Sequence, residues 1–310
     1  MSRQPVIIDC DPGHDDAIAI LLALSHPQLE VKAITTVHGN QTLPKVTDNA
    51  LRLLTAIGRT DIPVAAGCAR PLVAAPVTAP EIHGESGLDG PNMPEPAFRP
   101  LDEHAVNTII RILRTSDRKV TLIPTGPLTN IAAALLKAPD IMTNIEHIYL
   151  MGGAIHEGNK TPVAEFNIYV DPHAAKVVFT SGLPITMIGL DVTHQARMGE
   201  EEIARLRAMD RPVAHLVADL ITFFMGTYRR VFGFDYAPLH DAVAVAQAIA
   251  PGIVATRRLH VDVETTSPLT FGQTIVDLYG VTGREPNANV GFRLDRDAFL
   301  EMLMAAIATY

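Results

Sequence analysis

The chain has 310 residues, of which 47% are hydrophobic and 5% aromatic, so it can bury a large and mainly aliphatic core. Lys and Arg number 25 against 34 Asp and Glu, and a net charge of −9 without a basic run argues against nucleic acid or an anionic membrane as partner. The start of the chain lacks a signal-peptide pattern, no apolar run could span a bilayer, and there are only two cysteines, so we expect a soluble cytoplasmic protein.

Short β-branched runs alternate with longer Ala- and Leu-rich stretches of helical period. The runs typical of strands lie, in chain order, at residues 6–10, 31–37, 119–125, 147–153 and 184–192. The helical patterns lie at residues 15–26, 44–58, 104–116, 128–139 and 171–182. This alternation predicts an α/β fold with a mostly parallel (mixed) central sheet flanked by helices, and an active site at the C-terminal ends of the strands.

The remaining segments do not follow this alternation. From about residue 200 the pattern is more helical, residues 256–293 are rich in strands and turns, and residues 295–310 predict a closing helix. Residues 68–101 are rich in Pro and Gly and predict a long ordered loop of a kind that usually serves function. Because no repeat or linker divides the chain, we expect one domain over residues 1–310.

Four aspartates fall within eight residues at the end of the first predicted strand, namely Asp9, Asp11, Asp15 and Asp16. The DPG segment at residues 11–13 suits a type II turn, which would place the last two aspartates in the first turn of a helix. The helix dipole favours negative charge there, by about 0.3–1 kcal/mol for each carboxylate. It does not explain why Asp9 and Asp11 converge on the same place.

A divalent cation would neutralise such a cluster and explain why it is tolerated. With only oxygen ligands in view, Ca²⁺ or Mg²⁺ is favoured over zinc. Further acids are then expected at other strand ends, where Asp191 and Asp241 are found, and loop 125–130 could offer backbone carbonyls. The simpler alternative is that Asp11 caps a helix and the other carboxylates are solvated.

The segment DCDPGHDDAIA (9–19) resembles the signature of the inosine–uridine-preferring nucleoside hydrolases. Further segments follow that family's order, at residues 34–43, 83–91, 124–132, 151–159, 162–175, 189–194 and 238–242. The chain is therefore identified as a member of this family. The resemblance implies Ca²⁺-dependent hydrolysis of the N-glycosidic bond of ribonucleosides to ribose and free base, by a homodimer or homotetramer.

The resemblance also implies particular roles around the aspartate cluster. Asp11, Asp16, Asp241 and the backbone carbonyl of Thr125 would hold the Ca²⁺. Asp11 would also act as general base on the attacking water, and His240 would donate a proton to the leaving base. A core or capping histidine is the alternative for His240.

The substrate site implied by the resemblance combines polar and aromatic side chains. The residues expected at the sugar hydroxyls are Asp15, Asn40, Asn159, Glu165 and Asn167. Their amides and carboxylates suit hydroxyls, which both donate and accept hydrogen bonds. The other substrate contacts implied are His83, Met151, Tyr228 and Phe232. His83 belongs to the long loop, which would close over the base.

One departure from the family pattern concerns the base. Pyrimidine-preferring relatives often carry a tyrosine eight residues before the histidine, where this chain has Phe232, and Tyr228 one helical turn earlier could take its place. The segments are most similar to the bacterial pyrimidine branch, so uridine and cytidine are the expected substrates. The alternatives are a broad-specificity inosine/uridine hydrolase and a Ca²⁺-dependent nucleoside-binding protein without turnover. A phosphatase of the haloacid-dehalogenase type also begins with a strand and DxD, but its later Lys and paired-Asp motif is missing here.

Overall fold

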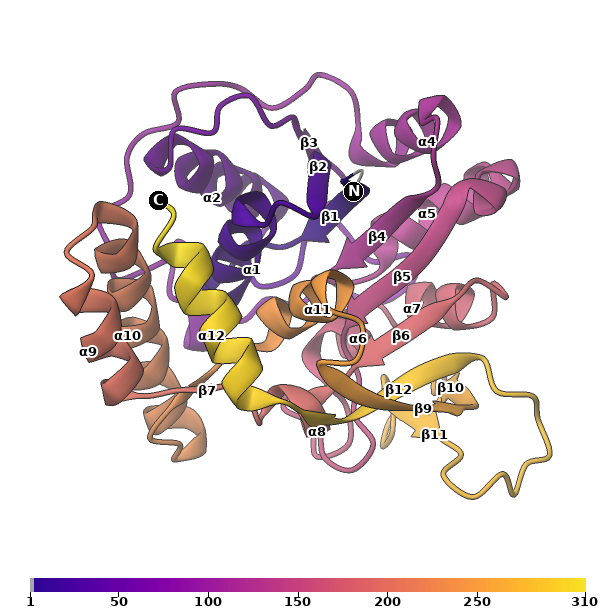
Figure 1. The fold of residues 1–310 in the computed structure, drawn as a ribbon. Coiled ribbons are helices and arrows are strands. Elements are labelled where there is room, and N and C mark those ends of the chain that lie inside the picture. Colours follow the sequence, from indigo (N-terminus) through magenta and orange to yellow (C-terminus); the bar gives the residue numbers. More distant parts are fainter. Residues whose placement is uncertain (1–2) are drawn as a thin grey trace.

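The structure, a computed structural model, describes residues 3–310 and is built on an eight-stranded sheet with the order β3-β2-β1-β4-β5-β6-β12-β9 (Figure 1). The strands are β1 (Gln4–Cys10), β2 (Leu29–Thr36), β3 (Val64–Ala66), β4 (Val120–Pro124), β5 (Ile145–Met151), β6 (Ile185–Ile188), β9 (Val254–Leu259) and β12 (Ala288–Leu294). All neighbouring pairs are parallel except β12 with β9, which closes one edge antiparallel. The prediction of a mostly parallel, mixed sheet is confirmed.

Helices cover both faces of the sheet (Figure 1). One hydrophobic core includes residues of α1 (His14–Ser25), α2 (Leu43–Ala56), α10 (Pro212–Phe232), α11 (His240–Ile249) and α12 (Arg296–Ile307). The other core includes residues of α4 (Ala105–Thr115), α5 (Thr129–Lys137) and α7 (Pro172–Phe179). In β1, Val6 and Ile8 belong to the first core and Ile7 to the second, because successive side chains of a strand point to opposite faces. A strand covered on both sides is mainly apolar, and the three central residues of β1, Val6, Ile7 and Ile8, are.

Shorter elements connect these layers and shape the site. The short helices are α3 (Pro80–His83), η1 (Pro139–Asn144), α6 (Phe166–Val170), α8 (Leu190–Thr193) and α9 (Glu200–Ala208). Two small antiparallel pairs complete the fold, β7 (Arg197–Met198) with β8 (Ala237–Pro238) and β10 (Val261–Val263) with β11 (Thr274–Val276). Among the described helices, none has both the length and the apolar character needed to cross a membrane.

Most predicted elements are confirmed, and the differences have local reasons. The strand expected at 184–192 ends at Ile188, because helix α8 begins two residues later. The predicted loop at 68–101 is confirmed except for the single helical turn of α3. Strand β3 was not predicted, since three residues are too few to show an alternating pattern.

The type II turn expected at residues 11–13 is wrong. Such a turn needs a positive φ at its second central residue, whereas Gly13 has φ −104° and ψ −165°. Gly13 is the N-cap of α1, and its N–H donates to Asp16 Oδ2 at 2.9 Å. The helix thus begins directly after the strand, which turns Asp15 and Asp16 toward the C-terminal end of β1.

Candidate active site

Two helices begin at the C-terminal edge of the sheet and bring acidic residues together there. Asp15 and Asp16 lie in the first turn of α1, and Asp241 lies in the first turn of α11. These two helices pack against each other, so their N-termini meet. The positive end of each helix dipole favours negative charge at this place and offsets part of the repulsion between the carboxylates.

The carboxylates of Asp15, Asp16 and Asp241 each present one oxygen, and these oxygens all lie within 4.8 Å of one another. All three side chains are buried. Burial raises the pKa of Asp15 to about 8, with the charge of Asp16 adding to the effect. Burial and the two neighbouring aspartates also raise the pKa of Asp241 well above its usual range. Three buried acids this close cannot all be ionised unless a cation compensates them.

Asp11 follows β1 and has its two oxygens in different surroundings. Oδ2 accepts a hydrogen bond from Asn40 N at 2.6 Å, whereas the buried Oδ1 has no hydrogen-bond partner among residues 3–310. The carboxylate is pressed between two backbones, because a Cβ on Gly39 would lie 2.0 Å from Oδ2 and one on Gly126 would lie 2.5 Å from Oδ1. Burial, followed by the charge of Asp16, raises the pKa of Asp11 well above its usual range. One oxygen is therefore fixed while the other remains available.

Asp16 is held by three hydrogen bonds. Oδ1 accepts from Thr125 Oγ1 at 2.8 Å, and Oδ2 accepts from Gly13 N at 2.9 Å and from Asn40 Nδ2 at 3.2 Å. The backbone carbonyl of Thr125 accepts from Asn167 Nδ2 at 2.7 Å. A carbonyl oxygen has two lone pairs, so this one can still bind a cation.

A polar wall lies opposite the acids and is formed by residues 151–167. Glu165 is the N-cap of α6, where its carboxylate accepts from Asn167 N and from two further backbone N–H groups. Burial raises the pKa of Glu165 to about 7. Asn159 Oδ1 accepts from Phe166 N at 2.9 Å, and Asn167 Nδ2 also contacts Met151 O at 3.3 Å. These bonds fix a row of amide and carboxylate groups along the wall.

His240 is held between two hydroxyl groups. Its Nδ1 lies 2.7 Å from Thr193 Oγ1 and its Nε2 lies 2.7 Å from Tyr228 OH. Burial lowers the pKa of His240 well below its usual range and raises that of Tyr228 well above it, so both groups are neutral. Phe232 packs on the Tyr228 ring with a centroid distance of 5.1 Å. The imidazole is thereby fixed in one orientation.

His83, the last residue of α3, brings the long loop onto the start of α1. Its Nδ1 lies 3.2 Å from His14 Nδ1, and its ring stacks on Phe224 of α10 at 5.3 Å. Burial lowers the pKa of His14 to about 4 and that of His83 well below its usual range. A Cβ on Gly13 would lie 2.6 Å from His83 Nδ1, so glycine is required where the two segments meet.

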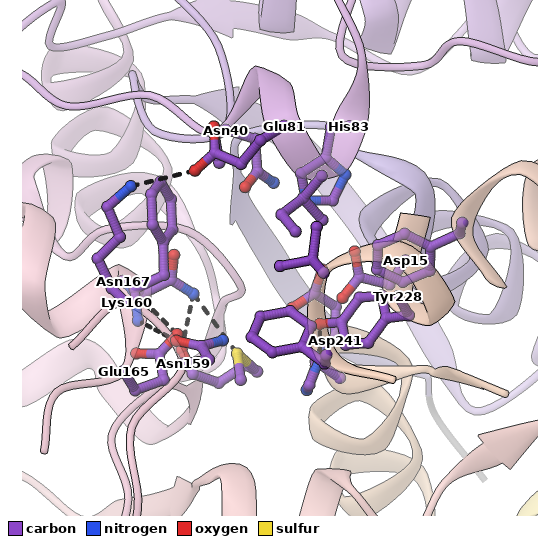
Figure 2. Close-up of a pocket in the computed structure, with 18 of the residues that line it drawn as sticks. Asp15, Asn40, Glu81, His83, Asn159, Lys160, Glu165, Asn167, Tyr228 and Asp241 are labelled. Carbon is purple, nitrogen blue, oxygen red and sulfur yellow. Dashed lines mark hydrogen bonds and ion pairs between the residues drawn. The ribbon is translucent and has the colours of Figure 1, made fainter. Parts of the chain in front are cut away.

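These groups surround a cavity of about 170 Å³ (Figure 2). Of the residues expected at the site, those that line it are Asp15, Asn40, His83, Thr125, Met151, Asn159, Glu165, Asn167, Tyr228, Phe232, His240 and Asp241. Asp11 and Asp16 are fully buried and do not line it.

The cavity is also lined by seven residues that the sequence did not predict, namely Ala79, Glu81, Ile82, Lys160, Phe166, Phe224 and Val231. Two of them could have been found from helical spacing, because Phe224 lies four residues before Tyr228 and Val231 three after it on α10. Lys160 follows Asn159 directly. Nothing in the sequence singles out Glu81 within the long loop.

Asp191 was expected among the clustered acids, and this expectation is wrong. Its Oδ2 accepts from Ile155 N at 2.6 Å and its Oδ1 lies 2.6 Å from His156 Nδ1. Strand β6 ends before Asp191, which lies in α8 and holds the loop after β5. Its role is to anchor backbone beside the cavity.

Asp9 also lies apart from the other acids, contrary to expectation. Its Oδ1 accepts from Thr35 Oγ1 at 2.5 Å and from Asn130 Nδ2 at 2.8 Å, and its Oδ2 has no hydrogen-bond partner in the described part of the chain. Residues of β1 alternate between faces, and this position points toward α5. Burial raises the pKa of Asp9 to about 7.

Comparison with known proteins shows close relatives over the whole chain. Residues 6–301 match the family model described as inosine-uridine preferring nucleoside hydrolase. A protein of Shewanella sp. (strain MR-4) named pyrimidine-specific ribonucleoside hydrolase RihA is 52% identical, over 100% of this chain and 98% of the relative. A protein of the same name from Photobacterium profundum is 50% identical over 100% of both chains.

Solved structures share the fold at lower identity. A purine-preferring ribonucleoside hydrolase from Gardnerella vaginalis superposes with a TM-score of 0.93 and 34% identity, over 99% of this chain and 98% of that one. A structure described as an inosine-guanosine nucleoside hydrolase gives a TM-score of 0.91 and 31% identity, over 99% of each chain. The whole fold, including the segments around the cavity, is therefore shared with hydrolases of differing base preference.

Proposed function

Because the chain belongs to the inosine-uridine preferring nucleoside hydrolase family and is a ribonucleoside hydrolase, we propose that it uses Ca²⁺ and prefers uridine and cytidine. The reaction breaks the bond between the anomeric carbon and the base nitrogen. Water adds its oxygen to that carbon, and its proton passes to the protein while the base gains a proton. The products are ribose and the free base.

The residues at the acidic cluster fit a hard cation. Buried carboxylate oxygens of Asp15, Asp16 and Asp241 converge within 4.8 Å, and no described residue donates a hydrogen bond to the buried Asp11 Oδ1. An all-oxygen donor set suits Ca²⁺ or Mg²⁺. We assign Asp11, Asp16, Asp241 and the carbonyl of Thr125 as the groups that would hold it, with Asp15 between cation and sugar. Such a cation would neutralise the carboxylates and lower the pKa of a water molecule bound to it.

Asp11 is the general base in this proposal. Its Oδ2 is fixed by Asn40 N, while Oδ1 is free to accept the proton of the attacking water. The close packing of Gly39 and Gly126 keeps the carboxylate from turning away.

His240 and Tyr228 form the leaving-group side. The Tyr228 hydroxyl lies 2.7 Å from His240 Nε2, so a proton can pass between the two groups and on to the departing base. Because both are neutral, each carries one hydrogen that it can donate in a hydrogen bond to the departing base, which takes up its proton from water through these two groups. Tyr228 thus takes the place of the tyrosine that pyrimidine-preferring relatives often carry where this chain has Phe232. The Phe232 ring offers a surface on which a base can stack.

The sugar is assigned to the polar groups on the rest of the cavity. The residues proposed to bind its hydroxyls are Asp15, Asn40, Asn159, Glu165 and Asn167, all of which line the cavity. Hydrogen bonds to neighbouring groups order Asn40, Asn159 and Asn167 before substrate binds, which reduces the entropy lost on binding. His83 and Met151 are assigned to the remaining substrate contacts.

The preference for pyrimidines is supported by sequence identity. The relatives named pyrimidine-specific ribonucleoside hydrolase RihA are 50–52% identical, whereas the solved purine-preferring and inosine-guanosine hydrolases are 34% and 31% identical. A broad inosine/uridine hydrolase is the second candidate, because the same fold serves purine nucleosides in those structures.

The observation that carries the proposal is the convergence of three buried aspartates beside a polar cavity, together with the Asp11 Oδ1 atom, which has no hydrogen-bond partner within residues 3–310. Its test is ribose release from uridine, cytidine and inosine, with CaCl₂ and after chelation. We expect calcium-dependent release that is fastest with the pyrimidine nucleosides. Equal release from inosine would point to the broad hydrolase. Uridine binding without ribose release would identify a binding protein instead.

We further propose a single-domain homodimer or homotetramer that acts in the cytoplasm in nucleoside salvage. The acidic composition and the two free cysteines, Cys10 and Cys68, are consistent with that compartment. The assembly is tested by light scattering of the purified protein, for which a monomer mass would contradict the proposal.

A further inference from the structure

An ion pair spans the mouth of the cavity between segments far apart in the sequence. Lys160 Nζ lies 3.3 Å from Glu81 Oε1, and both side chains line the cavity (Figure 2). Glu81 is half exposed and Lys160 is mostly buried, with 24% of its side chain accessible. A partly exposed ion pair adds on the order of 0–1 kcal/mol to the free energy of unfolding, so stability alone does not account for its position at the cavity.

Both partners stand on ordered backbone. Glu81 lies on α3, whose start is fixed by Ala79 N donating to Asn40 O at 3.0 Å. Lys160 lies in a compact turn in which its own N–H donates to Ala164 O at 3.1 Å. Its ammonium group also lies over the Phe166 ring, 5.7 Å from the centroid. The ammonium would therefore keep its place if Glu81 lost its charge.

Acidic side chains predominate around this ion pair. Among the described residues that line the cavity, the carboxylates are Asp15, Glu81, Glu165 and Asp241, and Lys160 carries the sole basic side chain of Lys or Arg type. Lys160 follows Asn159 in the chain and contacts Phe166, so it belongs to the wall that we assign to the sugar. Glu81 pairs with the one Lys or Arg side chain among the described lining residues that could bind an anion attached to the sugar.

We propose that Glu81, by pairing with Lys160, determines selectivity against nucleosides that carry a phosphate monoester on the sugar. This proposal rests on the proposed function. A phosphate monoester has a charge of about −1.5 to −2 at pH 7 and would need an available cation in this acidic cavity. In the wild-type protein the Lys160 ammonium is paired with Glu81, and the Glu81 carboxylate repels the phosphate.

The experiment compares uridine 5′-monophosphate with uridine on the full-length protein in CaCl₂. Calorimetry gives the Kd of the nucleotide, and ribose release gives the KM of uridine. In the Glu81→Gln variant we expect the ratio of nucleotide Kd to uridine KM to fall by at least about tenfold, the effect of one hydrogen bond to a charged group. In the double variant Glu81→Gln/Lys160→Gln the ratio returns to the wild-type value.

The matched control is Glu95→Gln, which removes the same charge from the same long loop. Glu95 pairs with Arg52 and does not line the cavity. An unchanged ratio of nucleotide Kd to uridine KM in Glu81→Gln would overturn the proposal. So would a fall in this ratio that persists in the double variant, or one that is equally large in Glu95→Gln. If the wild-type protein released no ribose from uridine, the proposed function would fail, whereas the nucleotide Kd would still report on Glu81.

Discussion

At the scale of single residues, the four aspartates of the first motif have three different environments. Asp15 and Asp16 belong to the converging group, Asp11 has one fixed and one free oxygen, and Asp9 faces another part of the core. Identical side chains therefore have different chemistry because of the direction in which each leaves the backbone.

The first prediction concerns Asp11. The Asp11→Asn variant keeps the shape of the side chain but removes the base, so we expect kcat/KM for uridine to fall by roughly 10²–10⁴-fold. Ribose release in CaCl₂ measures this, and the Tm shows whether the fold is intact. The Glu95→Gln variant is expected to retain wild-type activity. Activity of Asp11→Asn within tenfold of wild type would exclude Asp11 as the base.

The second prediction concerns Asp9 and pH. Burial raises the pKa of Asp9 from 3.8 to about 7. Between these two pH values the carboxyl group keeps its proton in the folded state but has lost it in the unfolded state. Stability of the wild type should therefore decline as pH rises through this window and level off above it. The side chain introduced in Asp9→Asn stays neutral, so this contribution to the pH dependence is absent in the variant. Between pH 5 and pH 8 the unfolding free energy of Asp9→Asn should therefore rise by roughly 3 kcal/mol relative to wild type. This value corresponds to the two pH units below a pKa of about 7, at about 1.36 kcal/mol each.

Urea unfolding at a series of pH values measures this difference. Parallel profiles for wild type and Asp9→Asn would show that Asp9 ionises normally in the folded protein.

At the scale of elements, loops after the strands place backbone directly against the reacting groups. The loop after β2 presents Gly39 to one oxygen of Asp11, and the loop after β4 presents Gly126 to the other. Neither glycine has a positive φ, so the requirement is for space and not for an unusual backbone conformation. The elements thus determine how precisely the carboxylate is held.

The third prediction tests this packing. In Gly39→Ala the new methyl group would lie 2.0 Å from Asp11 Oδ2 and 2.9 Å from Pro127 Cδ, which forces the carboxylate to move. A displacement of about 1 Å can cost a factor of about 100 in rate, so we expect a loss of that size in kcat/KM. The control is Gly226→Ala in α10, where a Cβ meets no atom within 4 Å. Equal activities of the two variants would contradict this interpretation.

At the scale of the whole molecule, the fold buries several carboxyl groups close together, and they cannot all be ionised without a cation. Segments from β1 to α11 bring four buried carboxylates to one edge of the sheet, and burial raises the pKa of each. The helix N-termini of α1 and α11 offset only part of this cost. Binding of a cation should therefore stabilise the entire fold.

The fourth prediction follows from this linkage. Ca²⁺ at a hundred times its Kd should add about 2.7 kcal/mol to the unfolding free energy, and chelation should lower the Tm and stop ribose release. In Asp241→Asn, which removes one proposed ligand, the rise in Tm with Ca²⁺ should be smaller. Differential scanning fluorimetry at several Ca²⁺ concentrations measures both effects. A Tm independent of Ca²⁺ in the wild type would contradict the assignment of the metal.

The sequence by itself determined the alternation of strands and helices, the position of acids at strand ends, and the family. These features are local or follow chain order, since a strand buried on both faces must be apolar and a helix start tolerates acids. The same local rules predicted a type II turn at Gly13 incorrectly, because they do not show where the next helix begins.

Only the tertiary structure decided which groups meet. Asp241 joins the acids of α1, whereas Asp191 anchors a loop and Asp9 contacts Asn130, although all of these lie near strand ends. The pairing of Glu81 with Lys160 joins residues 79 positions apart. The physical reason is that side-chain direction depends on strand alternation and on the exact residue at which a helix starts. Contacts across such distances in the chain depend on how the layers pack, which no local pattern encodes.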